Sequence, residues 1–244
     1  MLEIFTQPEA WIALLTLTFL EIVLGIDNII FISMVSGKLP KEQQPKARMV
    51  GLSLALIMRL ILLSMISYIT QLTQPITELF GYAITWRDLI LFVGGLFLIA
   101  KSTKELHHKV TDVEHEVTAK AYNSFAKAIF QIIVLDLIFS FDSILTAIGL
   151  TDQLILMIIA VIISIIIMMV FAGKISDFIN KYPTLQVLAL SFLILIGFTL
   201  ILEVEALGIH IPKGYIYFAV FFSLAVETIN INATKKRKKN EASA

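Results

Sequence analysis

Two short stretches of the sequence carry the same arrangement of acidic residues. Residues 21–28 read EIVLGIDN and residues 136–143 read DLIFSFDS. In each stretch an acid is followed by five mostly apolar residues, an aspartate and a small polar residue, all inside a longer apolar run. A charged side chain in the core of a bilayer costs several kcal/mol or more, so its default explanation is function. We interpret the two stretches as the halves of one cation site.

The side chains of these stretches that could bind a metal do so through oxygen. The candidate metal ligands are Glu21, Asp27, Asn28, Asp136, Asp142 and Ser143. Such hard donors suit Mg²⁺, Ca²⁺ or Mn²⁺ and argue against copper and zinc, which prefer sulfur and imidazole. Four carboxylates exceed the charge of one divalent ion, so some could be protonated at rest and could couple metal movement to protons. The alternative is that the buried acids only pair with structural partners.

The spacing of the acids constrains how one ion could reach them. On an unbroken helix, two residues six apart differ by about 9 Å in height and about 120° in direction. Gly25 lies between the first pair of acids and Ser140 between the second. We therefore expect a local break of the helix at each position, which would turn both acids toward one cavity. Discontinuous helices of this kind are common at transporter sites.

Two further charged side chains fall inside apolar runs. Arg59 lies in the middle of the second predicted span. An unpaired charge there would be very costly, so Arg59 should face the bundle and pair with one of the acids. It could be a structural counter-ion or a gating cation that holds the empty site. Glu227, in the last predicted span, could line an inner vestibule or reach the interface toward the basic tail. We treat both as accessory residues.

The elements that position these residues are predicted to be transmembrane helices. The chain is 58% hydrophobic and only 16% charged, whereas about a quarter of the residues of an ordinary globular domain are charged. A helix needs about 20 apolar residues to cross a bilayer. We predict seven spans, at residues 11–35, 48–70, 86–101, 124–148, 153–173, 184–203 and 214–231.

Lysine and arginine alternate between the connections of these spans. Most of them lie after the first, third and fifth spans and in the tail, whereas the other side carries only Arg87 and Lys213. The positive-inside rule then places the N-terminus outside and the C-terminus in the cytoplasm. We interpret the basic tail as a topology anchor rather than a nucleic-acid-binding segment. Histidines and acids in the loop 101–127 could bind metal loosely, but a solvated, partly helical loop is the simpler interpretation.

The repeated motif divides the chain into two halves of three spans. Because three is odd, the halves insert with opposite orientations, as in transporters whose site lies near the midplane between inverted repeats. Gly95 and Gly197, in the third and sixth spans, are a weaker echo of the repeat. The predicted divisions are a first repeat at 1–108, a cytoplasmic loop at 109–123, an inverted second repeat at 124–207, a seventh helix at 208–234 and a basic cytoplasmic tail at 235–244. The predicted fold is an all-α polytopic membrane protein.

At these motifs the sequence resembles the TerC family, which is named for tellurium resistance. The resemblance rests on the two acidic stretches and extends over nearly the whole chain, including Arg59, the Gly94-Gly95 pair and the run PKGYIYFA from Pro212. At Ile133 this chain lacks an acid that some members carry one turn before the second motif. The family is grouped with lysine-exporter-like transporters built from two inverted three-helix repeats, and its characterised bacterial members resemble manganese exporters.

The resemblance implies Mn²⁺ efflux across the cytoplasmic membrane, with Glu21, Asp27, Asp136 and Asp142 as the matched acids. Another hard cation such as Ca²⁺ or Mg²⁺ is an alternative substrate. A membrane assembly or biogenesis factor is an alternative function, although a scaffold gains nothing from buried carboxylates. We expect no enzymatic activity and no cofactor, since Mn²⁺ is the transported substrate. The expected partners are a divalent cation and the lipid bilayer, with no nucleic acid and no oligomeric state fixed by the sequence.

Overall fold

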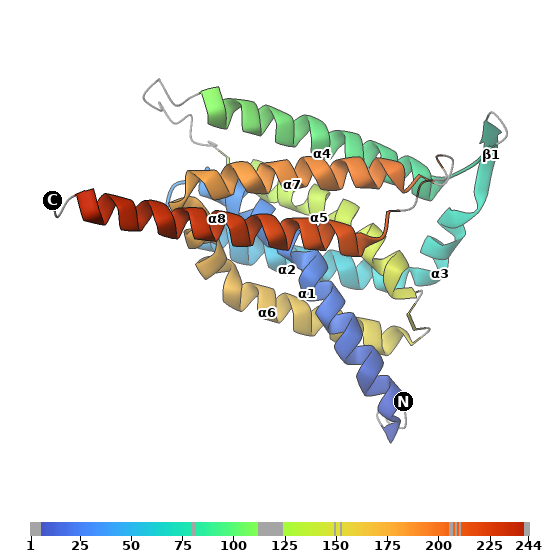
Figure 1. Cartoon of the computed structure of the whole chain (residues 1–244). Helices are drawn as coiled ribbons and strands as arrows, with labels where there is room; N and C mark the ends of the chain where they lie inside the picture. The colour runs from blue at the N-terminus through green and yellow to red at the C-terminus, as the bar shows by residue number, and fades with distance from the viewer. Residues whose placement is uncertain are drawn as a thin grey trace.

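The computed structural model describes residues 6–79, 82–111, 124–148, 150–151, 153–204, 207, 209 and 211–241. The chain is almost entirely helical, and its long helices lie side by side in one bundle (Figure 1). These helices are α1 (Pro8–Gly37), α2 (Gln44–Ser64), α4 (Trp86–Thr111), α5 (Phe125–Ile148), α6 (Leu154–Lys181), α7 (Pro183–Leu202) and α8 (Lys213–Glu241). The short helix α3 (Ile66–Ile69) and a 3₁₀ turn (Thr70–Thr73) follow α2.

In the described part of the chain, six helices are long and apolar enough to cross a membrane, namely α1, α2, α5, α6, α7 and α8. The predicted all-α polytopic membrane protein is therefore confirmed. The predicted third span falls within α4, which packs along α7 in the same bundle. Its outward side chains Phe92, Val93 and Leu96 are exposed and apolar, as a lipid-facing surface requires. A seventh crossing by α4 stays a prediction that this surface supports.

Local sequence signals set several of the helix ends. Pro8, Pro45 and Pro183 lie in the first turns of α1, α2 and α7, where a missing backbone N–H costs nothing. The start of α4 is a capping box. The Asp88 carboxylate accepts hydrogen bonds from the Thr85 hydroxyl at 2.8 Å and the Thr85 N–H at 3.0 Å, while the Thr85 hydroxyl accepts from the Asp88 N–H at 3.1 Å.

A β-hairpin precedes α4 and was not predicted. Strand β1 (Pro75–Leu79) pairs antiparallel with β2 (Tyr82–Thr85), with a shift of register between Pro75 and Thr77. The hairpin projects from one end of the bundle, beside α3 and the start of α4 (Figure 1). Its side chains are mostly exposed, so the apolar periodicity used to find the spans gave no sign of it.

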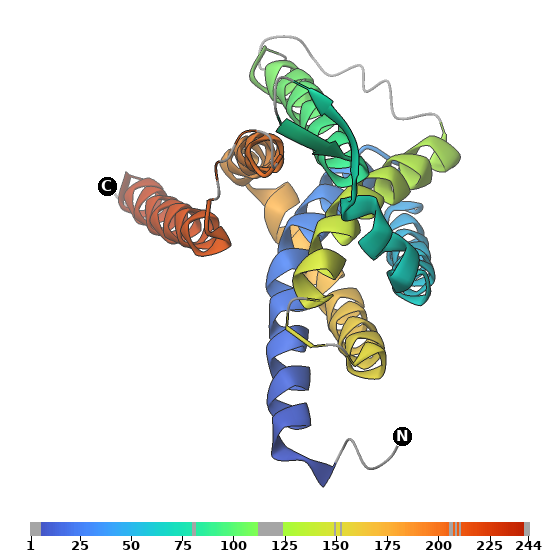
Figure 2. The same ribbon diagram turned by 90° about the vertical axis from the view of Figure 1, so that its right-hand side faces the viewer.

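The pairing of helices follows the two halves of the predicted repeat. The most extensive contacts are α1 with α6 and α4 with α7, followed by α2 with α5 and α2 with α6. Exchanging the halves (α1, α2, α4 for α5, α6, α7) maps α1–α6 onto α5–α2 and leaves α4–α7 unchanged. Helix α8 lies outside this arrangement at the periphery, beside α7 (Figure 2). This pattern supports an inverted repeat with an added helix.

Basic residues collect at one end of the bundle. Lys38, which follows α1, pairs with Glu105 near the end of α4. The ammonium of Lys235 on α8 lies 5.1 Å from the ring centroid of Tyr182, between α6 and α7. The hairpin and the start of α1 lie at the opposite end (Figure 1). By the positive-inside rule, the basic end is predicted to face the cytoplasm.

Candidate functional site

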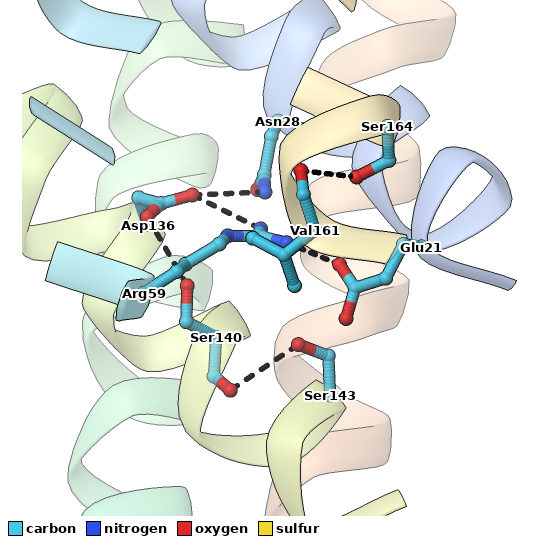
Figure 3. Close-up of polar contacts among 8 residues, drawn as sticks. All are labelled: Glu21, Asn28, Arg59, Asp136, Ser140, Ser143, Val161 and Ser164. Carbon is cyan, nitrogen blue, oxygen red and sulfur yellow. Dashed lines mark hydrogen bonds and ion pairs between the residues drawn. The ribbon is translucent and has the colours of Figure 1, made fainter. Parts of the chain in front are cut away.

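Arg59 of α2 bridges two helices in the core of the bundle. Its side chain is 2% exposed, and Nη1 pairs with Oε2 of Glu21 on α1. Nη2 donates to Oδ1 of Asp136 on α5 at 3.1 Å. Figure 3 shows the guanidinium extending between the two carboxylates. The first acids of the two repeated motifs therefore meet at one cation, and the predicted pairing of Arg59 with an acid is confirmed.

Asp136 is the most heavily hydrogen-bonded member of this group. Its Oδ1 also accepts from the Asn28 amide at 3.1 Å, and its Oδ2 accepts from the Ser140 hydroxyl at 3.1 Å. Ser143 lies on the same face and donates to the Ser140 carbonyl at 3.2 Å. We call these residues the buried acid cluster: Glu21, Asn28, Arg59, Asp136, Ser140 and Ser143. All are at most 5% exposed.

Helical spacing explains why these particular residues meet. Asn28 follows Glu21 by seven positions, which is almost two full turns, so both side chains lie on one face of α1. Ser140 and Ser143 follow Asp136 by four and seven positions and share one face of α5 in the same way. In each motif the first acid and the final small polar residue therefore lie on the helix face that points toward the other motif.

The predicted breaks at Gly25 and Ser140 are wrong. Helices α1 and α5 run without interruption through both positions. Gly25 serves packing instead, since a Cβ there would lie 2.3 Å from the sulfur of Met168 on α6. Ser140 keeps its helical conformation and donates to Asp136 four residues earlier. Sequence reasoning missed this role, although the spacing of four and a hydroxyl inside an apolar helix were visible signals.

The charges and polar atoms of the cluster are not fully balanced. With both acids ionised, two carboxylates face one guanidinium, which leaves one negative charge in excess. Among the described residues, Oδ1 of Asn28 and Nε of Arg59 have no hydrogen-bond partner. Buried polar atoms are nearly always satisfied by protein, water or an ion. The cluster therefore has the capacity to accept a further polar or cationic ligand.

The remaining predicted site residues fall into two groups. The side chains of Asp27 and Asp142 lie outside the described part of the structure, so their roles stay predictions. Glu227 lies on the peripheral helix α8, half-buried, and is not part of the buried acid cluster. Within the described residues, no group of three or more His, Cys, Asp or Glu side chains is arranged to hold a metal ion. Of the predicted loop, His107 and His108 belong to α4, and residues 112–123 lie outside the described residues.

Comparison with known protein families gives a match over almost the whole chain. Residues 6–242 match the integral membrane protein TerC family. This chain belongs to the TerC family. The UPF0053 inner membrane protein YgdQ of Escherichia coli K12 is 54% identical over 231 residues, which cover 95% of this chain and 96% of the relative. A UPF0053 protein of Haemophilus influenzae is 48% identical over 239 residues, or 98% of this chain and 100% of the relative. The resemblance recognised in the motifs is confirmed.

Other TerC relatives are longer. The UPF0053 inner membrane protein YoaE of Escherichia coli K12 is 45% identical over 230 residues, which cover 94% of this chain but 44% of that relative. No solved structure matches this chain. The names of its relatives and its membrane-spanning helices agree that this TerC protein is a multi-pass protein of the inner membrane.

Proposed function

We propose that this TerC protein exports a hard divalent cation, with Mn²⁺ as its main substrate, across the inner membrane. One observation carries the proposal: the first acids of the two repeated motifs, Glu21 and Asp136, converge on one buried cation in the core. Burying three charged groups is expensive, and well-packed apolar residues usually stabilise a core as well or better. A pure scaffold would not need this arrangement, whereas a cation pathway does.

The donor atoms of the cluster support the choice of ion. The carboxylates, the amide oxygen of Asn28 and the serine hydroxyls are all hard oxygen donors, which suit Mn²⁺, Mg²⁺ or Ca²⁺. The amide oxygen is buried and without a hydrogen-bond partner among the described residues, so it is already placed as an acceptor. The preference for Mn²⁺ within this class comes from the family resemblance.

In this proposal Arg59 is the cation that occupies the acids when no metal is bound. Its two Nη groups take one oxygen of Glu21 and one of Asp136. A metal ion that binds both carboxylates competes with the guanidinium for them, since two cations so close together repel each other strongly in a medium of low dielectric. Arg59 would then return when the ion leaves, which keeps the acids from remaining buried and unpaired.

Transport by everted membrane vesicles tests the proposal. In such vesicles the cytoplasmic face is outside, so export appears as uptake of Mn²⁺ into the lumen. We expect vesicles that carry the protein to take up Mn²⁺, with Mg²⁺, Ca²⁺ and Zn²⁺ as weaker competitors. The variants Asp27→Asn, Asp136→Asn and Asp142→Asn should lose this uptake at normal expression. Asp177→Asn, which makes the same change at an exposed position of α6, should keep it.

Uptake equal to that of empty vesicles would contradict Mn²⁺ export. Uptake that survives in the variants of all three aspartates would contradict a route through the acidic motifs.

A further inference from the structure

A pocket lies directly beside the buried acid cluster. It is small, with about 50 Å³ of space for the centres of water-sized molecules. Arg59 and Ser143 of the cluster form part of its wall. Its other polar lining residues are Thr199 and Glu203, at the end of α7, and Tyr217 of α8. The pocket therefore joins the interior of the bundle to the end of α7.

The contacts of Glu203 place this pocket at the hairpin end of the bundle. Glu203 is the residue that caps the C-terminus of α7. Its backbone oxygen accepts a hydrogen bond at 3.3 Å from Nη1 of Arg87, the second residue of α4. Arg87 lies two residues after the hairpin, which lies opposite the basic end. The positive-inside rule assigns the hairpin end to the periplasm.

The chemistry of the pocket suits a cation. The hydroxyl of Thr199 donates to the Ile196 carbonyl at 2.9 Å, so its oxygen keeps lone pairs toward the pocket. The C-terminal end of a helix carries a partial negative charge, which attracts cations. At the end of α7 the carbonyl groups of Thr199 and Ile201 already accept backbone hydrogen bonds, so the side chains of Thr199 and Glu203 are the donors that the pocket offers. The same dipole disfavours an acid at this position, so the placement of Glu203 at this end costs α7 some stability. In transporters, the C-terminal ends of discontinuous helices coordinate ions, which shows that a helix C-terminus can hold a cation inside a membrane.

We propose that Glu203 and this pocket form an outer station for the exported divalent cation, between Glu21 and Asp136 and the periplasm. The inference rests on the proposed function and assigns its exit side. An ion that leaves the buried acid cluster would meet one carboxylate, half-buried at the end of a helix, in place of two carboxylates that are fully buried. Fewer charged ligands and more water mean weaker binding, which favours release in this direction.

Cysteine labelling tests whether the pocket opens to the periplasm. The chain has no cysteine, so a single cysteine can be introduced without background. Ile216 lines the pocket and is half-buried. In spheroplasts, Ile216→Cys should react with a membrane-impermeant maleimide, and Mn²⁺ in the medium should slow the reaction severalfold. Thr77→Cys on the exposed hairpin is the control, which should react at the same rate with and without Mn²⁺.

The role of Glu203 is tested in the same cysteine background. Adding Glu203→Gln to Ile216→Cys should abolish the protection by Mn²⁺, whereas adding Glu78→Gln on the exposed hairpin should leave it intact. Failure of Ile216→Cys to react while Thr77→Cys reacts would overturn the outward opening and the inference with it. Protection that persists in the Glu203→Gln background would overturn Glu203 as a ligand.

The outcome is separable from the proposed function. If the wild-type protein transports Mn²⁺ in vesicles and Glu203→Gln transports it equally well with unchanged protection, the outer station alone is refuted. If no vesicle transport is found but Glu203 still mediates protection by Mn²⁺, the pocket binds a cation and Mn²⁺ export is refuted.

Discussion

Gly95 of α4 and Gly197 of α7 pack backbone against backbone. A Cβ on Gly95 would lie 2.5 Å from the Gly197 carbonyl oxygen, and a Cβ on Gly197 would lie 2.8 Å from the Gly95 carbonyl oxygen. Small residues let membrane helices approach this closely. Because the contact is reciprocal, it is the relationship expected of two equivalent positions on opposite sides of a twofold axis. It supports the inverted repeat that the sequence motifs predict.

Alanine at either glycine should separate α4 from α7. Backbone atoms cannot rotate away as a side chain can, so we expect Gly95→Ala and Gly197→Ala each to cost about 1–3 kcal/mol. The measurement is the melting temperature of the purified protein in detergent. Gly173→Ala in α6 is the matched control, since apart from its chain neighbours and the backbone of its own helix no atom lies within 4 Å of its Cβ position. Melting temperatures of Gly95→Ala and Gly197→Ala no lower than that of the control would refute the close approach.

Substitution of Gly25 tests whether this glycine is needed for close packing or for a break in the helix. The atom nearest its Cβ position is the sulfur of Met168, at the flexible end of a side chain. We expect Gly25→Ala to reduce stability and transport, and the double variant Gly25→Ala/Met168→Ala to recover both, because the second change removes the clash. Thermal melting and Mn²⁺ uptake into vesicles measure the two effects. If the double variant does not recover, the packing explanation is contradicted, and glycine is needed at this position for its backbone conformation.

Glu105 pairs with two lysines, Lys38 and Lys101, at the basic end of the bundle. Burial opposes its ionisation, but hydrogen bonds from Lys101, at 2.8 Å, and from Lys38 outweigh burial and lower the pKa of its carboxyl below the ordinary value of 4.5. A lowered pKa in the folded state means that the stabilisation is fully present above pH 4.5 and is lost as the pH falls through the folded value.

The difference in melting temperature between the wild type and Glu105→Gln should therefore be constant above this pH and shrink in more acid solution. Partly exposed ion pairs contribute about 1 kcal/mol or less, so the difference should be small. Glu42→Gln, an exposed change at the same end, should melt like the wild type at each pH. If the difference in melting temperature grows on acidification, folding does not lower the pKa of Glu105.

The sequence was sufficient for those features that depend on the membrane. Long uncharged runs must be helices in a bilayer, and an arginine inside one must find acids, so the helices and the pairing of Arg59 were predictable. The start of α2 at Gln44 was harder to predict, because its first turns contain basic residues. When charged residues are used to mark the end of a span, these turns are assigned to the loop. The hairpin of β1 and β2 lies outside the apolar runs and left no such signal.

The geometry of the site could not be predicted from the sequence. The prediction of broken helices at Gly25 and Ser140 assumed that the two acids of one motif must reach the same ion. In the structure the first acids of different motifs, Glu21 and Asp136, meet across α1 and α5. The way in which two helices cross decides which side chains of their faces meet. The crossing depends on packing contacts such as that of Met168 with Gly25, and not on residue spacing alone.

Arg59 makes a distinct prediction for stability. Removing one partner of a buried ion pair costs about 3–5 kcal/mol, since the other charge is left unpaired. We expect Arg59→Leu to melt at a lower temperature than the wild type without metal, and to be stabilised by Mn²⁺ more than the wild type is, because nothing competes for the acids. Arg59→Lys retains the charge and should behave more like the wild type. A smaller Mn²⁺-induced shift in Arg59→Leu would identify Arg59 as a counter-ion that assists metal binding.

The binding of Mn²⁺ to the purified protein tests the central claim most directly. Electron paramagnetic resonance distinguishes free from bound Mn²⁺, so a titration gives the affinity without any assumption about transport. We expect Glu21→Gln and Asp136→Asn each to weaken binding about tenfold or more, equivalent to about 1.4 kcal/mol. The exposed changes Glu9→Gln and Asp177→Asn should leave the affinity unchanged. If a folded Glu21→Gln/Asp136→Asn double variant binds Mn²⁺ as tightly as the wild type, the cation site does not lie at these two acids.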